Sequence, residues 1–116
     1  MPENPTEAIN IVELKEIMDD DVELIQDCFT EFLNEWPVQY VDIKQAIMTK
    51  NAQALDETAH KLKGTLRYLA AESAANAAYA LEAAGKEKEM ENLDRKLEHL
   101  KEECRQVVEY IKGFTP

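Results

Sequence analysis

The stretch LDETAHKLKGTLRYL, residues 55–69, determines the fold class of this chain. Its apolar side chains recur at spacings of four, three, four and three, at Leu55, Ala59, Leu62, Leu66 and Leu69. That period is typical of the buried stripe of an amphipathic helix that packs against a core. We therefore predict a helix through this stretch, with its polar side chains turned toward solvent.

The helical period continues on the N-terminal side of this stretch. A short helix is expected over residues 11–18, with Asn10 as its cap, and a longer helix follows Asp21. Pro37 lies inside the longer helix and removes one backbone donor, so a kink or a break is expected just before it. Asn51 is expected to cap the helix of the quoted stretch.

Two more helices are predicted on the C-terminal side. Nine alanines lie between Ala70 and Ala84, and Gly85 is expected to end this alanine-rich helix. The last helix carries an unbroken alternation of apolar positions, at Met90, Leu93, Leu97, Leu100, Cys104, Val107 and Ile111. Such a stripe also suits a two-chain coiled coil, but three other amphipathic helices in the same chain favour an intramolecular bundle.

Length and composition limit the chain to one globular domain. It has 116 residues, of which 45% are hydrophobic and 32% are charged. We predict an all-α fold, an antiparallel four-helix bundle with a short N-terminal lid helix. The bundle is expected over residues 10–114, after a flexible segment of residues 1–9.

Charge and hydropathy exclude several kinds of partner. A formal net charge of -11 opposes binding to nucleic acid or to an anionic membrane surface. No basic leader with an apolar run opens the chain and no stretch is long enough for a membrane span, so a cytoplasmic location is expected. Cys28 and Cys104 lie on apolar helical stripes, and we expect both to be buried, reduced thiols. The sequence does not exclude a disulfide between them.

Two residues of the quoted helix depart from its apolar stripe. His60 and Gly64 lie one turn apart on the outward face. An exposed glycine inside a helix costs about 1 kcal/mol relative to alanine, which indicates that bulk is unwanted beside the imidazole. Lys63 adds a cation, so this constellation suits a histidine that transiently carries an anion. His99, within a charged helix, has no such neighbours and is interpreted as an ordinary surface residue.

The segment Ala59-His60-Lys61-Leu62-Lys63-Gly64 resembles the signature Ala-His-x-Leu-Lys-Gly of histidine phosphotransfer (HPt) domains of two-component phosphorelays. The resemblance extends from about Ile11 to Ile111. It includes Phe29-x-x-Phe32 and Pro37 before the site and Leu81-Glu82-Ala83-Ala84-Gly85 after it.

The resemblance also has a local departure. Members commonly carry small polar residues after the signature glycine and a second glycine about ten residues beyond the histidine. Here those places hold Leu66-Arg67-Tyr68 and Ala70. The difference concerns the turn after the helix and leaves the signature itself intact.

The resemblance implies that Nε2 of His60 receives a phosphoryl group and passes it between aspartates of response-regulator receiver domains. A hybrid sensor histidine kinase is the implied source. Lys63 is expected to stabilise the phosphoryl group and Gly64 to give docking access. The sequence has no phosphate-binding glycine-rich loop, so we do not expect a kinase. We expect a covalent phosphocarrier that is monomeric. No cofactor is expected in this chain, and the magnesium ion is expected from the docked receiver domain.

Further side chains are expected to flank His60. If the chain reverses around residues 71–73, antiparallel pairing places the alanine-rich helix opposite the imidazole. Glu82 is then expected to hydrogen-bond the ring and Lys86 to lie near the phosphoryl group. The complete set of expected flanking residues is Lys61, Arg67, Tyr79, Glu82, Ala83 and Lys86.

The sequence also offers two alternatives to a phosphocarrier. Glu57-x-x-His60 matches half of a di-iron bundle motif, but His99 is preceded at the same spacing by Lys96, so the second half is missing. The other alternative is a non-catalytic helical adaptor that docks receiver domains without being phosphorylated. The intact histidine, lysine and glycine of the signature argue against this adaptor.

Overall fold

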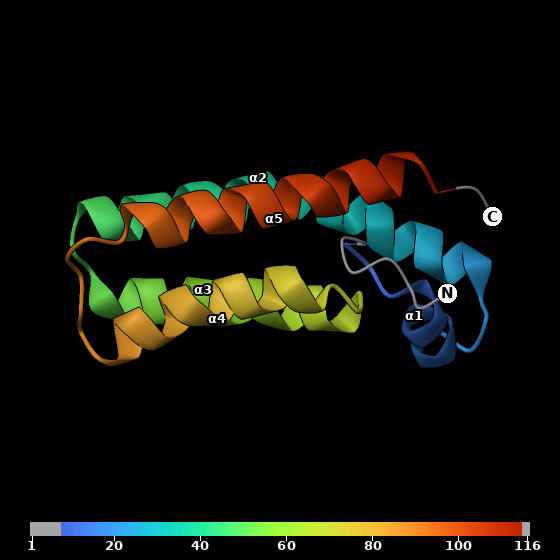
Figure 1. Cartoon of the computed structure of the whole chain (residues 1–116), viewed down its shortest axis with the longest axis horizontal. Coiled ribbons are helices and arrows are strands. Elements are labelled where there is room, and N and C mark those ends of the chain that lie inside the picture. Colours follow the sequence, from blue (N-terminus) through green and yellow to red (C-terminus); the bar gives the residue numbers. More distant parts are fainter. Residues whose placement is uncertain (1–7, 115–116) are drawn as a thin grey trace.

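The computed structural model describes residues 8–114, which form five helices and no strand. The helices are α1 (Ile11–Ile17), α2 (Val22–Met48), α3 (Ala52–Tyr68), α4 (Glu72–Lys86) and α5 (Asp94–Lys112). Helices α2 to α5 run alternately up and down as an antiparallel bundle, and the short α1 lies at one end of it (Figure 1). The predicted fold is confirmed.

Side-chain caps set the start of the first three helices. Asn10, Asp21 and Asn51 each accept a hydrogen bond from the backbone N–H three residues further on, at 3.1, 3.0 and 3.0 Å. Each cap satisfies a donor that the first helical turn leaves without a partner. Asn10 and Asn51 were expected as caps from the sequence, and Asp21 belongs to the acidic run 19–21 from which the cap of the longer helix was expected.

The first four helices end in a shared backbone motif. The residue after each C-cap has a left-handed conformation, with φ of 57°, 54°, 58° and 58° at Asp19, Lys50, Ala70 and Lys88. The next N–H donates to the carbonyl five residues back at 2.7 to 2.9 Å, as in a Schellman motif. The prediction that Gly85 ends α4 is therefore wrong, because α4 continues to Lys86 and the reversal is made at Lys88.

Ala70 makes the turn where the family pattern has a glycine. Its φ of 58° is the conformation that glycine adopts freely and that costs other residues roughly 1–2 kcal/mol. The turn is supported from outside, because the Ala70 carbonyl accepts a hydrogen bond from the Asn10 N–H at 3.0 Å. That bond ties the start of α1 to the connection between α3 and α4.

The kink that was expected near Pro37 is present without a break (Figure 1), and one helix bound differs from the expectation. Helix α2 is continuous through Pro37 and is not broken, and its two halves run at an angle to each other (Figure 1). Helix α5 begins at Asp94, so Met90 lies in the connection before it and Leu93 is its N-cap residue. Both Met90 and Leu93 still pack on the core.

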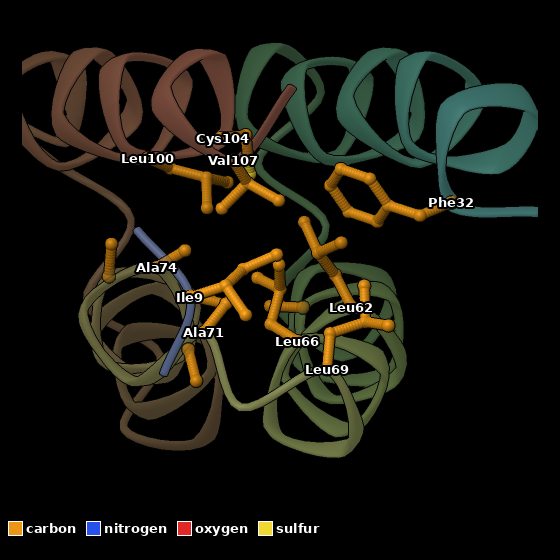
Figure 2. Packing of buried hydrophobic residues seen from close by; sticks show 14 of the residues in the cluster. Ile9, Phe32, Leu62, Leu66, Leu69, Ala71, Ala74, Leu100, Cys104 and Val107 are labelled. Atoms are coloured by element: carbon orange, nitrogen blue, oxygen red, sulfur yellow. The ribbon is translucent and has the colours of Figure 1, made fainter. Parts of the chain in front are cut away.

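The core lies between the pair α2–α5 and the pair α3–α4. The stripe of α3 is buried as predicted, and Leu62 and Leu66 point toward Phe32 of α2 and Val107 of α5 (Figure 2). Ile9 is 0% exposed, so the core begins inside the segment 1–9 that was expected to be flexible. Residues 1–7 of that segment lie outside the described residues.

The two cysteines are free thiols in different environments. Cys104 is fully buried, and this burial raises the pKa of its thiol to about 12. Cys28 is only partly buried, contrary to the expectation for it. Partial burial also raises the pKa of the Cys28 thiol. Both thiols are therefore protonated at neutral pH.

None of the helices in residues 8–114 combines the length and the hydropathy that crossing a membrane requires.

Gly85 allows α4 to approach α3 closely. A Cβ atom at this position would lie 2.7 Å from the Ala52 carbonyl oxygen and 2.7 Å from the Asp56 nitrogen. Both atoms belong to the α3 backbone, which cannot turn aside as a side chain can. Gly85 therefore sets the spacing of the two helices close to the site described below.

We expect Gly85→Ala to destabilise the protein by about 1–3 kcal/mol, because the added methyl group forces the two helices apart. Gly64→Ala is the matched control, since a Cβ at this other helical glycine meets no atom within 4 Å. It should raise stability by about 1 kcal/mol. Thermal unfolding of both variants measures the difference, and similar shifts would contradict this account of Gly85.

Candidate functional site

His60 projects from the outward face of α3, with 64% of its side chain exposed. Gly64 follows one turn later and is also exposed. A side chain at Gly64 would begin in open space, with no atom within 4 Å of its Cβ. The approach to the imidazole along α3 is thus open, as the sequence predicted.

A buried carboxylate from α4 holds the ring. Glu82 is 2% exposed, and no other charged residue among residues 8–114 is buried. Its Oε2 lies 3.1 Å from Nδ1 of His60, and its Oε1 lies 2.7 Å from Nζ of Lys63. Without these partners, the buried charge of Glu82 would destabilise the fold by an amount on the order of several kcal/mol.

The charge of Glu82 determines which ring nitrogen is free. Burial by itself raises the pKa of the carboxyl, but the contacts with Lys63 and His60 outweigh it and hold the pKa below its usual value. Glu82 is therefore ionised at neutral pH and can only accept a hydrogen bond. In the neutral ring, Nδ1 of His60 therefore carries the proton, which leaves the lone pair on Nε2 available as a nucleophile.

Lys63 and Lys86 reach Glu82 in different ways. The Lys63 side chain is only 12% exposed, and its ammonium lies 5.3 Å from the centre of the Tyr79 ring as well as on Glu82. The Lys86 side chain is 56% exposed, and its Nζ lies 3.6 Å from Glu82 Oε2 and 3.7 Å from Asp56 Oδ1. Lys63 is thus turned inward to Glu82, whereas the sequence suggested a cation on the open face.

A recess of about 510 Å³ adjoins the imidazole and is lined by Asp56, Glu57, His60, Lys61 and Lys86. Lys61 and Lys86 were predicted to flank the site, whereas Asp56 and Glu57 were not. Asp56 precedes His60 by four residues and so lies one turn earlier on the same face. The spacing is consistent with this position, but it does not distinguish Asp56 from any other acidic residue on a helix face.

The remaining expected residues are Ala83 and Arg67. Ala83 is partly buried on α4, and Arg67 is in the last turn of α3, where a cation interacts favourably with the helix dipole. Neither is among the residues that line the recess. His99 is an exposed residue of α5. Residues 8–114 contain no group of three or more histidine, cysteine or acidic side chains arranged to hold a metal ion.

The lowered pKa of Glu82 makes the stability of the protein pH-dependent. A carboxyl whose pKa is lower in the folded state stabilises the fold above its unfolded pKa, and this stability is lost as the pH falls through the folded pKa. We therefore expect wild-type stability to decline below pH 4.5, the ordinary value for glutamate. Glu82→Gln should lack that part of the decline, although it is less stable at neutral pH because Lys63 loses its anionic partner.

Glu102→Gln is the control for this experiment. The hydrogen bond from Arg105 lowers the pKa of Glu102 to about 2, but the pair lies on the exposed face of α5. Water screens an exposed pair, so its removal should change the acid dependence less than Glu82→Gln does. Thermal unfolding of each variant between about pH 7 and about pH 3 makes the comparison, and the reverse ranking would contradict it.

A helical bundle that presents one anchored histidine beside an open glycine is a scaffold for exchanging a group with a docked partner. The family model of the Hpt domain matches residues 27–110. The chain belongs to the Hpt domain family, whose members are histidine phosphotransfer domains of phosphorelays and act as phosphocarriers rather than kinases. The resemblance noted in the sequence is confirmed.

One solved structure shows the same fold. The crystal structure of histidine-containing phosphotransfer protein B (HptB) from Pseudomonas aeruginosa PAO1 matches with a TM-score of 0.75 and 23% sequence identity. The match covers 94% of this chain and 94% of that one. A search of curated protein sequences finds no match.

Proposed function

We propose that His60 is the phosphorylated residue of this phosphotransfer domain and that Nε2 is the atom that carries the phosphoryl group. The hydrogen bond between Nδ1 of His60 and the ionised Glu82, at 3.1 Å, carries the proposal. It fixes the tautomer in which Nε2 is unprotonated, on a ring that is 64% exposed. Gly64 supports the proposal because it leaves the approach to the ring open.

The transfer step needs no proton transfer to or from solvent. The Nε2 lone pair attacks the phosphorus of an aspartyl phosphate on a receiver domain, and the bond between phosphorus and the aspartate oxygen breaks. The carboxylate leaves with the electron pair, and the ring becomes cationic while its Nδ1 proton still binds Glu82. The buried carboxylate thereby neutralises the charge that develops on the ring. Delivery to a second receiver is the same step in reverse.

The basic residues of α3 follow His60, whereas its acidic residues Asp56 and Glu57 precede the histidine. Between residues 58 and 68, α3 carries Lys61, Lys63 and Arg67 and no acidic residue, in a chain with a net charge of -11. Of these, Lys61 and Arg67 are exposed and favour encounter with an anionic aspartyl phosphate, whereas Lys63 is paired with Glu82. In this proposal the magnesium ion belongs to the receiver domain, and this chain supplies the histidine and the surrounding cations.

The proposed donor is the receiver domain of a hybrid sensor histidine kinase, and the proposed acceptor is a response regulator. We further propose that the chain acts as a monomer in the cytoplasm. The support for a monomer is that the apolar stripes of α2 to α5 are buried within one bundle.

The test is transfer of labelled phosphate from phosphorylated receiver domains of the same organism. The label should move to this chain and be labile in acid and stable in alkali, as a phosphoramidate bond is. Incubation with ATP and magnesium in the absence of a receiver should leave the chain unlabelled. Receiver binding without any transfer would instead support the adaptor alternative.

A further inference from the structure

We infer that Tyr79 is a positioning residue of this site, because its ring covers the ammonium of Lys63 and thereby keeps the carboxylate of Glu82 in place. Glu82 in turn binds Nδ1 of His60, so the inference rests on the proposed role of that histidine. The sequence indicated Tyr79 only as a side chain that flanks the imidazole.

Lys63 is covered although its neighbours on α3 are open to solvent. The side chain of His60, three residues earlier, is 64% exposed, and the next residue, Gly64, is also exposed. Only 12% of the Lys63 side chain is exposed. Lysine side chains ordinarily keep the ammonium in water, so specific contacts must hold this one inward.

Two residues of α4 hold the ammonium of Lys63. Oε1 of Glu82 lies 2.7 Å from its Nζ, and the centre of the Tyr79 ring lies 5.3 Å from the same atom. Tyr79 and Glu82 are three residues apart on α4, so their side chains are neighbours on one face of that helix. The ring contact is a cation–π interaction, in which the negative face of an aromatic ring attracts a cation.

The ring of Tyr79 strengthens the ion pair that it covers. Tyr79 is 49% exposed and stands at the surface, whereas Glu82 is 2% exposed. An ion pair that water reaches contributes little to stability, and a covered pair is screened much less. Removing the ring would admit water to Lys63 and let its ammonium leave the carboxylate.

The position of Glu82 determines which nitrogen of the imidazole carries the proton. Lys63 binds Oε1 and His60 binds Oε2, so the lysine keeps the carboxylate from turning away from the ring. A neutral imidazole carries its proton on either nitrogen, and an acceptor at Nδ1 selects between the two forms. Nε2 has a free lone pair only in the form that Glu82 selects. Tyr79 therefore controls, through Lys63, how much of His60 is ready to attack phosphorus.

Nitrogen NMR of the His60 ring and phosphorylation by potassium phosphoramidate test the inference together. In the reaction, Nε2 attacks phosphorus, the phosphorus–nitrogen bond breaks with its electron pair on nitrogen, and ammonia leaves. In mildly alkaline solution, where histidine rings are neutral, Tyr79→Leu should lower the fraction of rings protonated on Nδ1 about threefold. The rate at which phosphohistidine forms, followed by phosphorus NMR, should fall by the same factor. Tyr79→Phe keeps the aromatic face and should match the wild type in both measurements.

Tyr68→Leu is the matched control. Tyr68 is 51% exposed at the end of α3, and within residues 8–114 no cation lies over its ring. This variant should keep the wild-type protonation of His60 and the wild-type rate. Thermal unfolding of both leucine variants checks that the fold is intact.

A Lys63→Met background shows whether the Tyr79 ring acts through the lysine. Adding Tyr79→Leu there should change neither measurement further, because no ammonium remains for the ring to hold. The inference is overturned by wild-type behaviour of Tyr79→Leu, by a loss that Tyr79→Phe shares, or by an equal loss in both backgrounds. Phosphorylation of His60→Gln at the wild-type rate would instead show that the proposed function itself is wrong.

Discussion

His60→Gln is expected to abolish phosphorylation of this chain completely. The amide nitrogen of glutamine has no free lone pair and cannot attack phosphorus, and His60 is the site residue with a nucleophilic nitrogen. The substitution should leave the fold intact, because the side chain is 64% exposed and Glu82 keeps Lys63 as a partner at 2.7 Å. Label transfer from a phosphorylated receiver domain measures the effect, with thermal unfolding as the check on folding.

His99→Gln is the matched control for this experiment, because it removes the second histidine from an exposed position of α5. It should accept phosphate at the wild-type rate. Label that persists in His60→Gln, or label that disappears in His99→Gln, would show that the phosphorylated residue has been assigned wrongly.

Gly64→Gln is expected to block transfer from a receiver domain while the protein stays folded. A glutamine here begins in open space and should, if anything, stabilise α3, because glutamine has the higher helix propensity. It would nevertheless stand one turn from the imidazole, in the path of a docking protein. Displacing the reacting atoms by about 1 Å can lower a rate about 100-fold, so we expect a loss of at least that order.

The small donor phosphoramidate separates docking from chemistry in this variant. Gly64→Gln should still react with phosphoramidate at close to the wild-type rate, because a small molecule does not need the open surface of α3. Gly64→Ala should transfer from the receiver at an intermediate rate. Normal transfer from the receiver to Gly64→Gln would refute the role of Gly64 in access, and loss of both reactions would mean that Gly64 affects the histidine itself.

The helices could be predicted because their signals are local. The apolar period of residues 55–69 reports one buried face of a helix, and Asn10, Asp21 and Asn51 are side chains that cap the turn next to them. The ends of the helices were harder to predict. A left-handed residue usually suggests glycine, but here Ala70 and Lys88 take that conformation, and at Ala70 a hydrogen bond from the Asn10 N–H supports the turn.

The site was predictable to the extent that it lies on one helix. His60 and Gly64 share the outward face of α3 because of their spacing, and antiparallel pairing brought Glu82 to the imidazole. Asp56 was missed although its spacing places it on the same face, because an acidic residue on an exposed helix carries no distinctive signal.

The amino-acid sequence by itself determined that this chain is a helical bundle with an accessible histidine and an open glycine beside it, since both follow from spacing along one helix. Only the tertiary structure decided the direction of the lysines. Lys63 is turned inward because the carboxylate of Glu82 is buried by the close approach of α4 and must be neutralised there. Gly85 permits that approach, and its role depends on backbone atoms of another helix that no local pattern reveals.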